Sequence, residues 1–458
     1  MRRTRRTIVG VALASVATST LIAAAAPSGS LEAAVQAHGV GGDPVIEWNE
    51  NAGEATVAAC FLGGYAPQEA RMYAMVQLAV HDALNGIHRR SRPYAVGLQA
   101  PGASPGAAVA TAAHDVLVSV LSSLSFFLPA ECVSAGIASV EADYAATLEA
   151  LPDGPPKIRG VALGQDAADA VLTLRASDGF DTPLVDPNYQ EGSAPGEYRY
   201  TPGTPFAFAP ALGDDLIPFV LEDSSQFRPG PPYNLTSHRY AADVNEIQRL
   251  GGDDVTTPSD RTDEQTQIAL FWVESSPLAW NRIARSVATA EGLDSWQNAR
   301  LLGLLNLALA DGYIGTWDTK YHYRFWRPVT AIRLADIDDN PATTADPSWT
   351  PLLENPPIPD YDSGHAVEGG AAAQVLTRFF GTDRMSFSNC SYTLPSGQTC
   401  ADESPTLRHF TRFSQAADEN AVSRIYVGFH FRDAVETGTR HGEKIADRTV
   451  DLHLRPRH

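Results

Sequence analysis

The feature that most constrains the fold is the repeated spacing of apolar residues close to 3.6. In segment 70–87, ARMYAMVQLAVHDALNGI, the apolar positions follow this spacing, as expected for a helix with one buried face. Few segments alternate with a period of two, so the sequence predicts an all-α fold. Similar helical patterns recur over residues 106–127, 132–151, 157–177, 237–250, 262–275, 278–290 and 294–315.

The helical pattern is interrupted over residues 179–235. This stretch is rich in Pro, Gly and aromatic residues and has no sustained period, which predicts a long ordered loop or a domain connector. We therefore expect an N-terminal helical region with its long loop over residues 45–235. A C-terminal helical region follows over residues 236–458.

The N-terminus has the pattern of an export signal. Four arginines precede an apolar stretch of small residues, and Ala23-Ala24-Ala25 offers a cleavage site. We expect residues 1–26 to be a signal peptide and the mature protein to be secreted or periplasmic; an uncleaved membrane anchor is the alternative. The arginine pair loosely fits a twin-arginine signal. No later run is apolar enough to span a membrane, so no membrane association is expected after cleavage.

Charge and cysteine content exclude some classes of partner and site. The chain has 34 basic and 54 acidic residues, a net charge of -20, which argues against a nucleic-acid partner. Four cysteines allow three disulfide connectivities, and none of them has zinc-ligand spacing. A local Cys390–Cys400 bridge is favoured because a short Pro-Ser-Gly loop separates the two residues, and this would leave Cys60 with Cys132.

Basic residues nevertheless gather in KYHYRFWRP, residues 320–328. On one helix, Lys320 and Arg327 would lie on the same face two turns apart, and Pro328 would end or kink that helix. Their long side chains could then converge on one small anion. Taken alone, a solvated basic face is the simpler interpretation.

Two further stretches carry histidines. In PDYDSGHA, residues 359–366, the Ser-Gly-His triplet precedes a strong helix pattern, so a hydroxyl and free backbone N–H groups would face an anion. In SRIYVGFHFRD, residues 423–433, Arg424 and His430 could meet only if the chain bends near Gly428. Alone, each histidine could be an incidental packed residue. Together, the three stretches predict one pocket for a tetrahedral oxyanion.

The three motifs Lys-x6-Arg-Pro, Ser-Gly-His and Ser-Arg-x5-His resemble those of the vanadium-dependent haloperoxidases and the type 2 phosphatidic acid phosphatases. The likeness to bacterial haloperoxidase homologues extends over ALADGYIGTWDTKYHYRFWRPVTAIR, the surroundings of His81-Asp82-Ala83, and AADAVLTLRASDG. It thus covers most of the mature chain. The resemblance implies an all-helical fold of paired four-helix bundles with long Pro/Gly-rich loops.

The resemblance also implies a role for each motif residue. Vanadate is the expected cofactor, and phosphate would bind the same site. The implied catalytic residues are His365 as acid–base group at the apical oxygen, Lys320 polarising peroxide, and His430. The implied vanadate contacts are Lys320, Arg327 and Arg424 on the equatorial oxygens, Ser363 and the Gly364 N–H, and His430 as the metal ligand. Trp317 matches an aromatic residue near the halide position, or is simply a core residue.

Three departures from the family pattern bear on the site. Asp362 stands where the family usually has proline; we expect it to be a helix cap, although it could also repel the oxyanion or orient His365. The phosphatase pattern His-x3-Asp is not met, because Asp433 follows His430 by only three residues. The partner of His430 is therefore open. Ile358, seven residues before His365, gives no indication of halide preference.

The function expected from the resemblance is a haloperoxidase. It would use hydrogen peroxide to oxidise a halide and halogenate a small organic acceptor. The alternative is a secreted acid phosphatase in which His430 forms a phosphohistidine and His365 protonates the leaving group. A non-catalytic phosphate-binding protein is a third interpretation. The chain length, the pair Trp317 and Trp326, and the exported form without later membrane spans favour the haloperoxidase.

Overall fold

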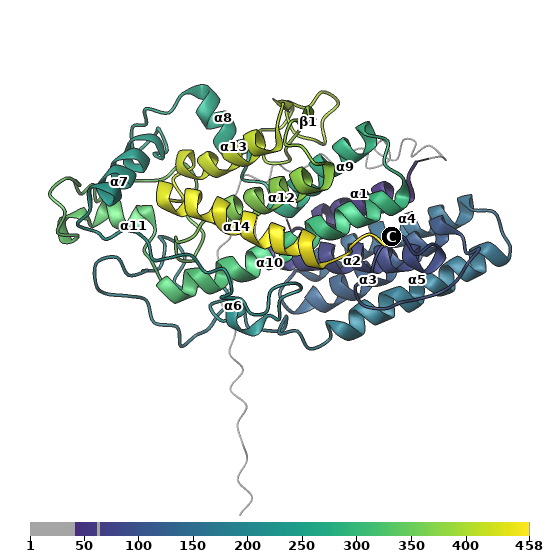
Figure 1. Ribbon diagram of the computed structural model, residues 1–458. Coiled ribbons are helices and arrows are strands. Elements are labelled where there is room, and N and C mark those ends of the chain that lie inside the picture. Colours follow the sequence, from purple (N-terminus) through teal and green to yellow (C-terminus); the bar gives the residue numbers. More distant parts are fainter. Residues whose placement is uncertain (1–41, 62–64, 458) are drawn as a thin grey trace, which may run out of the picture. The chain divides into compact units, whose positions relative to one another are not determined.

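The computed structural model describes residues 42–61 and 65–457, and its helices confirm the all-α expectation (Figure 1). Over the described residues the strands pair as one two-stranded antiparallel sheet, β1 (Phe387–Asn389) with β2 (Arg408–Phe410). The helices are α1 (Pro44–Ala58), α2 (Ala66–Ile87), α3 (Pro105–Ser123), α4 (Ala130–Ala150), α5 (Pro155–Leu174), α6 (Leu212–Asp215), α7 (His238–Leu250), α8 (Asp263–Phe271), α9 (Ser276–Ala290), α10 (Ser295–Tyr323), α11 (Pro328–Arg333), α12 (Gly364–Phe380), α13 (Phe413–Tyr426) and α14 (Arg432–Leu452), with short 3-10 turns η1 (Leu124–Phe126) and η2 (Ala335–Ile337).

Helix boundaries follow from local sequence signals. The long helix α10 begins at a capping box, in which the Asp294 side chain accepts from backbone N–H groups and Gln297 bonds back to the cap. It ends at Arg324, whose φ of 48° is left-handed. Helix α12 ends at Gly381 with φ 74°, a conformation that glycine adopts without steric cost. The sequence therefore marks the end of α12 by a glycine, whereas α10 ends at a non-glycine residue in the left-handed region.

The helices pack through their buried faces. Helix α2 packs against α3 and α10, and α3 packs against α5; farther along the chain, α12 packs against α10, α13 and α14. Helices α12 and α14 approach closely because glycines face the neighbouring backbone: a Cβ at Gly442 would collide with the carbonyl of Val367. This contact places the N-terminal ends of α12 and α14 side by side, and Ser363 N–H donates to the Ala434 carbonyl at 3.1 Å.

The other sequence expectations have different outcomes. Both favoured disulfides are present, Cys60–Cys132 and Cys390–Cys400. The expected long loop is also present, with only the short α6 between α5 and α7. The described residues belong to one compact unit, and the boundary between residues 235 and 236 stays a prediction. The expected signal peptide lies outside the described residues.

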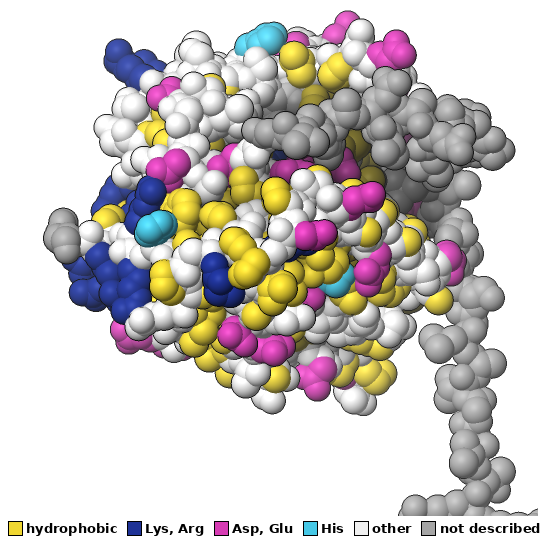
Figure 2. All heavy atoms as spheres, turned by 90° about the vertical axis from the view of Figure 1, so that its right-hand side faces the viewer, with side chains coloured by type: hydrophobic (Ala, Val, Ile, Leu, Met, Phe, Trp, Pro, Cys, Tyr) yellow, Lys and Arg dark blue, Asp and Glu magenta, His cyan; other side chains and the backbone are white. Residues whose placement is uncertain are grey.

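One described helix, Pro105–Phe126, is long and apolar enough to cross a membrane, but 67% of its apolar window is buried inside the protein. Figure 2 shows one face of the molecule, on which basic side chains gather toward one edge while acidic side chains are spread more widely. Lys320, Arg327 and Arg424 do not contribute to the surface charge, because each is at most 3% exposed.

Candidate anion site: buried cations and two histidines

The three sequence stretches meet at the ends of four helices. Lys320 lies in the last turn of α10 and Arg424 in the last turn of α13. Ser363 is the N-cap of α12, and His430 lies in the segment joining α13 to α14. The three stretches are in contact: Arg327 Nη1 lies 3.2 Å from His430 Nε2, and Lys320 Nζ donates to the carbonyl of Asp362, the residue before Ser363. The predicted meeting of the three motifs is therefore observed.

Lys320 and Arg327 do not lie on one helix, because the chain breaks before Pro328, as the proline indicated. Helix α10 ends at Tyr323, the chain turns at Arg324, and Arg327 becomes the N-cap of α11 just before Pro328. The reversal still brings Arg327 to the site, where its Nη1 lies 3.2 Å from His430 Nε2. The predicted bend near Gly428 is present, with φ 83°, and a Cβ there would clash with the Gly251 carbonyl.

Lys320 is bound to the loop that precedes α12. Its Nζ donates to the carbonyl oxygens of Pro359, Asp360 and Asp362 at 3.0, 2.8 and 2.5 Å. These contacts use all three donors of an ammonium group. Burial and the charge of Arg327 lower the pKa of Lys320 to about 7. Lys320 thus orders this loop and places its charge beside the site.

Three buried donors at the site have no hydrogen-bond partner within the described part of the chain: Arg327 Nη2, Arg424 Nε and Ser363 Oγ. The other contacts of the two arginines are fixed. Arg327 donates from Nε to the Ile358 carbonyl at 2.6 Å, and Arg424 donates from Nη1 to the Trp272 carbonyl at 2.9 Å. Burial lowers the pKa of Arg424 to about 9. Unpaired buried donors are costly, and a tetrahedral oxyanion would satisfy them. The residues present therefore fit vanadate or phosphate.

His430 has a carboxylate partner that the sequence did not reveal. Its Nδ1 lies 2.8 Å from Asp360 Oδ1, and both residues are buried. Asp433 points elsewhere, accepting from Tyr233 N–H at 3.3 Å. Burial and the charge of Arg327 lower the pKa of His430 well below its ordinary value, whereas burial raises the pKa of Asp360 to about 7. The open question about the partner of His430 is thus answered by Asp360.

His365 occupies the first turn of α12 and is half-buried. Its Nε2 lies 3.2 Å from the Glu274 carbonyl oxygen. A carbonyl only accepts, so Nε2 carries the hydrogen, and a neutral ring keeps its lone pair on Nδ1. Burial and the charge of Arg424 lower the pKa of His365 well below its ordinary value. The ring is therefore neutral and able to accept a proton.

Asp362 is not a helix cap, and that expectation is wrong. Ser363 is the N-cap of α12, and the Asp362 side chain instead lies 2.9 Å from His441 Nδ1 on α14. Both side chains are buried. The carboxylate is therefore paired with α14, and only its backbone carbonyl contacts Lys320.

The remaining predicted residues have weaker links to the site. Gly364 is the first residue of α12, and an added Cβ would meet only Tyr313 and Thr316 at 3.7 and 3.8 Å. Trp317 is buried and packs edge-on against Phe208 and Tyr313. For the residues that the structure covers, no hydrogen bond or ion pair joins Trp317 to the cation cluster. Its placement near a halide stays a prediction.

Among the described residues, no group of three or more His, Cys, Asp or Glu side chains could hold a bare metal ion. The site instead offers cations, a hydroxyl and one imidazole nitrogen. This donor set suits a metal that arrives as an oxyanion.

Comparisons with known proteins agree with this geometry. The model of the VCPO second helical-bundle domain matches residues 300–457, which include all the predicted site residues. A vanadium chloroperoxidase from Curvularia inaequalis is 26% identical over 307 residues, covering 54% of this chain and 48% of that protein. The chain thus spans about half the length of this curated relative.

Solved structures extend the similarity to almost the whole chain. The crystal structure of a protein described as the first bacterial vanadium-dependent iodoperoxidase has a TM-score of 0.70 and 26% identity, covering 90% of this chain and 97% of that one. A holo-type bacterial vanadium-dependent chloroperoxidase has the same fold, with a TM-score of 0.66 at 20% identity over 88% and 94% of the two chains. Residues 300–457 therefore match the family of the VCPO second helical-bundle domain, and the chain as a whole is similar to bacterial vanadium haloperoxidases.

Proposed function

We propose that this protein is a vanadium-dependent haloperoxidase that oxidises halide with hydrogen peroxide and halogenates a small organic acceptor. The observation that carries this proposal is the set of three unpartnered buried donors, Arg327 Nη2, Arg424 Nε and Ser363 Oγ, in the same three stretches as His430, whose Nε2 lies 3.2 Å from Arg327 Nη1. When bound, vanadate would supply Lewis-acid activation of peroxide. The proteins to which this chain is similar are vanadium haloperoxidases, and this similarity supports vanadate as the cofactor.

The cations would bind the equatorial oxygens of the anion. Arg327 and Arg424 present planar guanidinium groups, which bind tetrahedral oxyanions through paired N–H donors. Lys320, whose three donors are engaged by carbonyls, would polarise peroxide through its charge when it is protonated, and its pKa is about 7. Because these groups are already positioned, little reorganisation is needed when charge develops at the site.

The histidines would divide two tasks. His430 would bind the metal through Nε2, which faces the cations, while Asp360 holds the opposite nitrogen. His365 would accept the proton of peroxide on Nδ1, since its Nε2–H is engaged by the Glu274 carbonyl. Ser363 Oγ and the Gly364 N–H at the start of α12 would add hydrogen bonds to the anion.

A phosphatase remains the second candidate, because phosphate has the shape and charge of vanadate. The Asp360–His430 pair also fits this candidate, since a carboxylate can orient a histidine nucleophile. There His430 would attack phosphorus, and His365 would protonate the leaving alkoxide.

Two assays on the purified protein separate the candidates. Bromination of a phenol-red type acceptor by peroxide is measured with and without added vanadate, beside hydrolysis of p-nitrophenyl phosphate. We expect vanadate-dependent bromination with negligible hydrolysis. Hydrolysis that vanadate only inhibits would exclude the haloperoxidase and support the phosphatase. Neither activity, with vanadate or phosphate binding retained, would favour the non-catalytic anion-binding protein.

We also propose that the protein is exported to an oxidising compartment. The two disulfides support this, because such bonds persist outside the reducing cytosol. Fractionation of the producing cells tests the proposal. Recovery of the protein only from the cytosol, with free thiols, would contradict it.

A further inference from the structure

Residues 270–275, which comprise the end of α8 and the segment joining it to α9, contact the candidate site. Its carbonyl groups hold two of the predicted site residues. The Trp272 carbonyl accepts from Arg424 Nη1 at 2.9 Å, and the Glu274 carbonyl lies 3.2 Å from His365 Nε2. The position of this segment therefore sets the position of a guanidinium and of the imidazole that would accept the proton.

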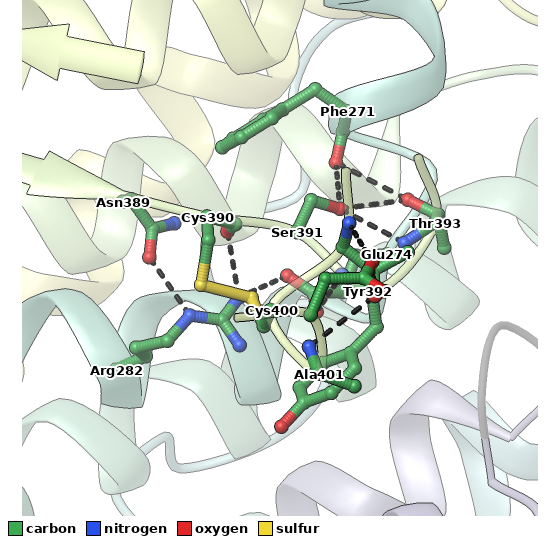
Figure 3. The surroundings of a disulfide bond; sticks show 12 residues. Phe271, Glu274, Arg282, Asn389, Cys390, Ser391, Tyr392, Thr393, Cys400 and Ala401 are labelled. Atoms are coloured by element: carbon green, nitrogen blue, oxygen red, sulfur yellow. Dashed lines mark hydrogen bonds and ion pairs between the residues drawn. A yellow bond between two sulfur atoms is a disulfide. The ribbon is translucent and has the colours of Figure 1, made fainter. Parts of the chain in front are cut away.

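The Cys390–Cys400 loop binds the other side of the same segment (Figure 3). Ser391 Oγ donates to the Phe271 carbonyl at 2.7 Å, and Thr393 Oγ1 donates to the Leu270 carbonyl at 2.7 Å. Tyr392 N–H donates to the Glu274 carboxylate at 3.1 Å. Three consecutive residues beside Cys390 thus bond to this one stretch of backbone and to its buried carboxylate.

Arg282 of α9 contacts both the Cys390–Cys400 loop and Glu274. Its guanidinium forms an ion pair with the Glu274 carboxylate, and donates to Asn389 Oδ1 at 2.9 Å and to the Cys390 carbonyl at 3.1 Å. Glu274 is 2% exposed, so its charge depends on this partner. The loop, Arg282 and Glu274 form a continuous network that ends on His365.

We propose that the Cys390–Cys400 loop is a positioning element for His365 and Arg424, acting through Arg282 and Glu274. The proposal rests on the proposed function only in naming His365 as the acid–base group. Glu274 is a positioning residue, since its side chain is held by the loop while its carbonyl fixes the Nε2–H tautomer of the imidazole. Without the disulfide, residues 389–393 would gain freedom, and both carbonyl contacts would be less well defined.

The second disulfide provides a matched control. Cys60 and Cys132 are 72 residues apart, whereas Cys390 and Cys400 are only 10 apart. A bridge that closes a longer loop restricts the unfolded chain more, so a purely stabilising role predicts that losing Cys60–Cys132 is the more damaging change. A positioning role predicts that only the loss of the short bridge alters His365.

The test compares C390S/C400S with C60S/C132S in the full chain. The histidine rings are labelled with 15N, and the His365 signals are assigned with a His365→Gln variant. We expect the Nε2–H form of His365 to be the single tautomer in the wild type and in C60S/C132S, and a mixture in C390S/C400S. An unchanged His365 tautomer in C390S/C400S would overturn the proposal.

A second variant keeps the test decisive if the cysteine changes impair folding. Glu274→Gln keeps the size of the side chain but loses the ion pair with Arg282. We expect it to mix the His365 tautomers and to lower kcat about 10- to 100-fold, with KM for peroxide changed much less, because a misplaced proton acceptor slows the chemical step. A folded Glu274→Gln protein with unaltered His365 signals would also overturn the proposal.

The two readouts separate this inference from the proposed function. The tautomer of His365 is measured without vanadate, peroxide or halide. If no haloperoxidase activity exists but C390S/C400S still disturbs His365, the proposed function fails and the positioning role stands. If activity exists and His365 is undisturbed, the positioning role fails alone.

Discussion

Replacing Asp360 by Asn tests how His430 is prepared to bind the oxyanion. Arg327 Nη1 lies 3.2 Å from His430 Nε2, and a guanidinium can only donate. Nε2 must therefore carry the lone pair, and a neutral ring carries its hydrogen on Nδ1, where it donates to Asp360 Oδ1 at 2.8 Å. Asp360 thus selects the tautomer whose free nitrogen faces the cations.

An amide at position 360 keeps the shape but weakens the acceptor, and its NH₂ group can bond to Nδ1 instead. That alternative places the hydrogen on Nε2 and blocks the coordinating nitrogen. Loss of a group that orients a metal-ligating histidine typically costs 10- to 100-fold in affinity. We therefore expect Asp360→Asn to weaken vanadate binding by about 1.4 to 2.8 kcal/mol.

The assay is titration calorimetry with vanadate at pH 8, above the pKa of about 7 of Asp360, so that the wild type carries a carboxylate. The sign of the effect is decisive. Removing a negative charge near a bound anion would strengthen binding if simple charge repulsion dominated. Tighter or unchanged binding in Asp360→Asn would refute the orienting role. Asp433→Asn is the matched control, because Asp433 accepts from Tyr233 N–H instead of contacting His430.

Three further predictions concern other residues. His430→Ala should abolish vanadate retention with an unchanged circular dichroism spectrum, and unaltered vanadate affinity would remove His430 from the ligand role. Asp362→Pro should lose the contact with His441 but keep activity, since the Asp362 side chain is directed to α14; complete loss of turnover would give Asp362 a catalytic task. Burial raises the pKa of Glu69 from 4.5 to about 7, so the folded state binds this proton more tightly and its stability falls as pH rises between these values. Between pH 5 and pH 8, the free energy of unfolding measured in urea should fall by as much as about 3 kcal/mol less in Glu69→Gln than in the wild type. An equally steep pH dependence in the variant would contradict the assignment.

The helices could be predicted because their signals are local. Apolar spacing marks α2, and the Ser-Gly-His triplet stands directly before the strong helix pattern of α12. The disulfide Cys390–Cys400 is also nearly local. The helix end at residues 323–324 could be predicted only in part. Pro328 indicated a break, but no sequence signal predicted the left-handed conformation of Arg324.

The site residues that lay in motifs were found, whereas their supporting residues were not. Asp360 reaches His430 across 70 positions and Glu274 reaches His365 across 91, and no periodic spacing encodes such contacts. Asp362 was expected to cap α12 because it stands beside the helix start. A buried imidazole on a distant helix bound it instead, which shows that a tertiary partner can outweigh a local preference.

A crystal structure of the protein soaked with vanadate tests the central claim most directly. The account predicts one tetrahedral or five-coordinate oxyanion within bonding distance of His430 Nε2, with its oxygens contacted by the donors that now lack partners, Arg327 Nη2, Arg424 Nε and Ser363 Oγ. Vanadate bound elsewhere, or these three donors left without it at saturating concentration, would contradict the account.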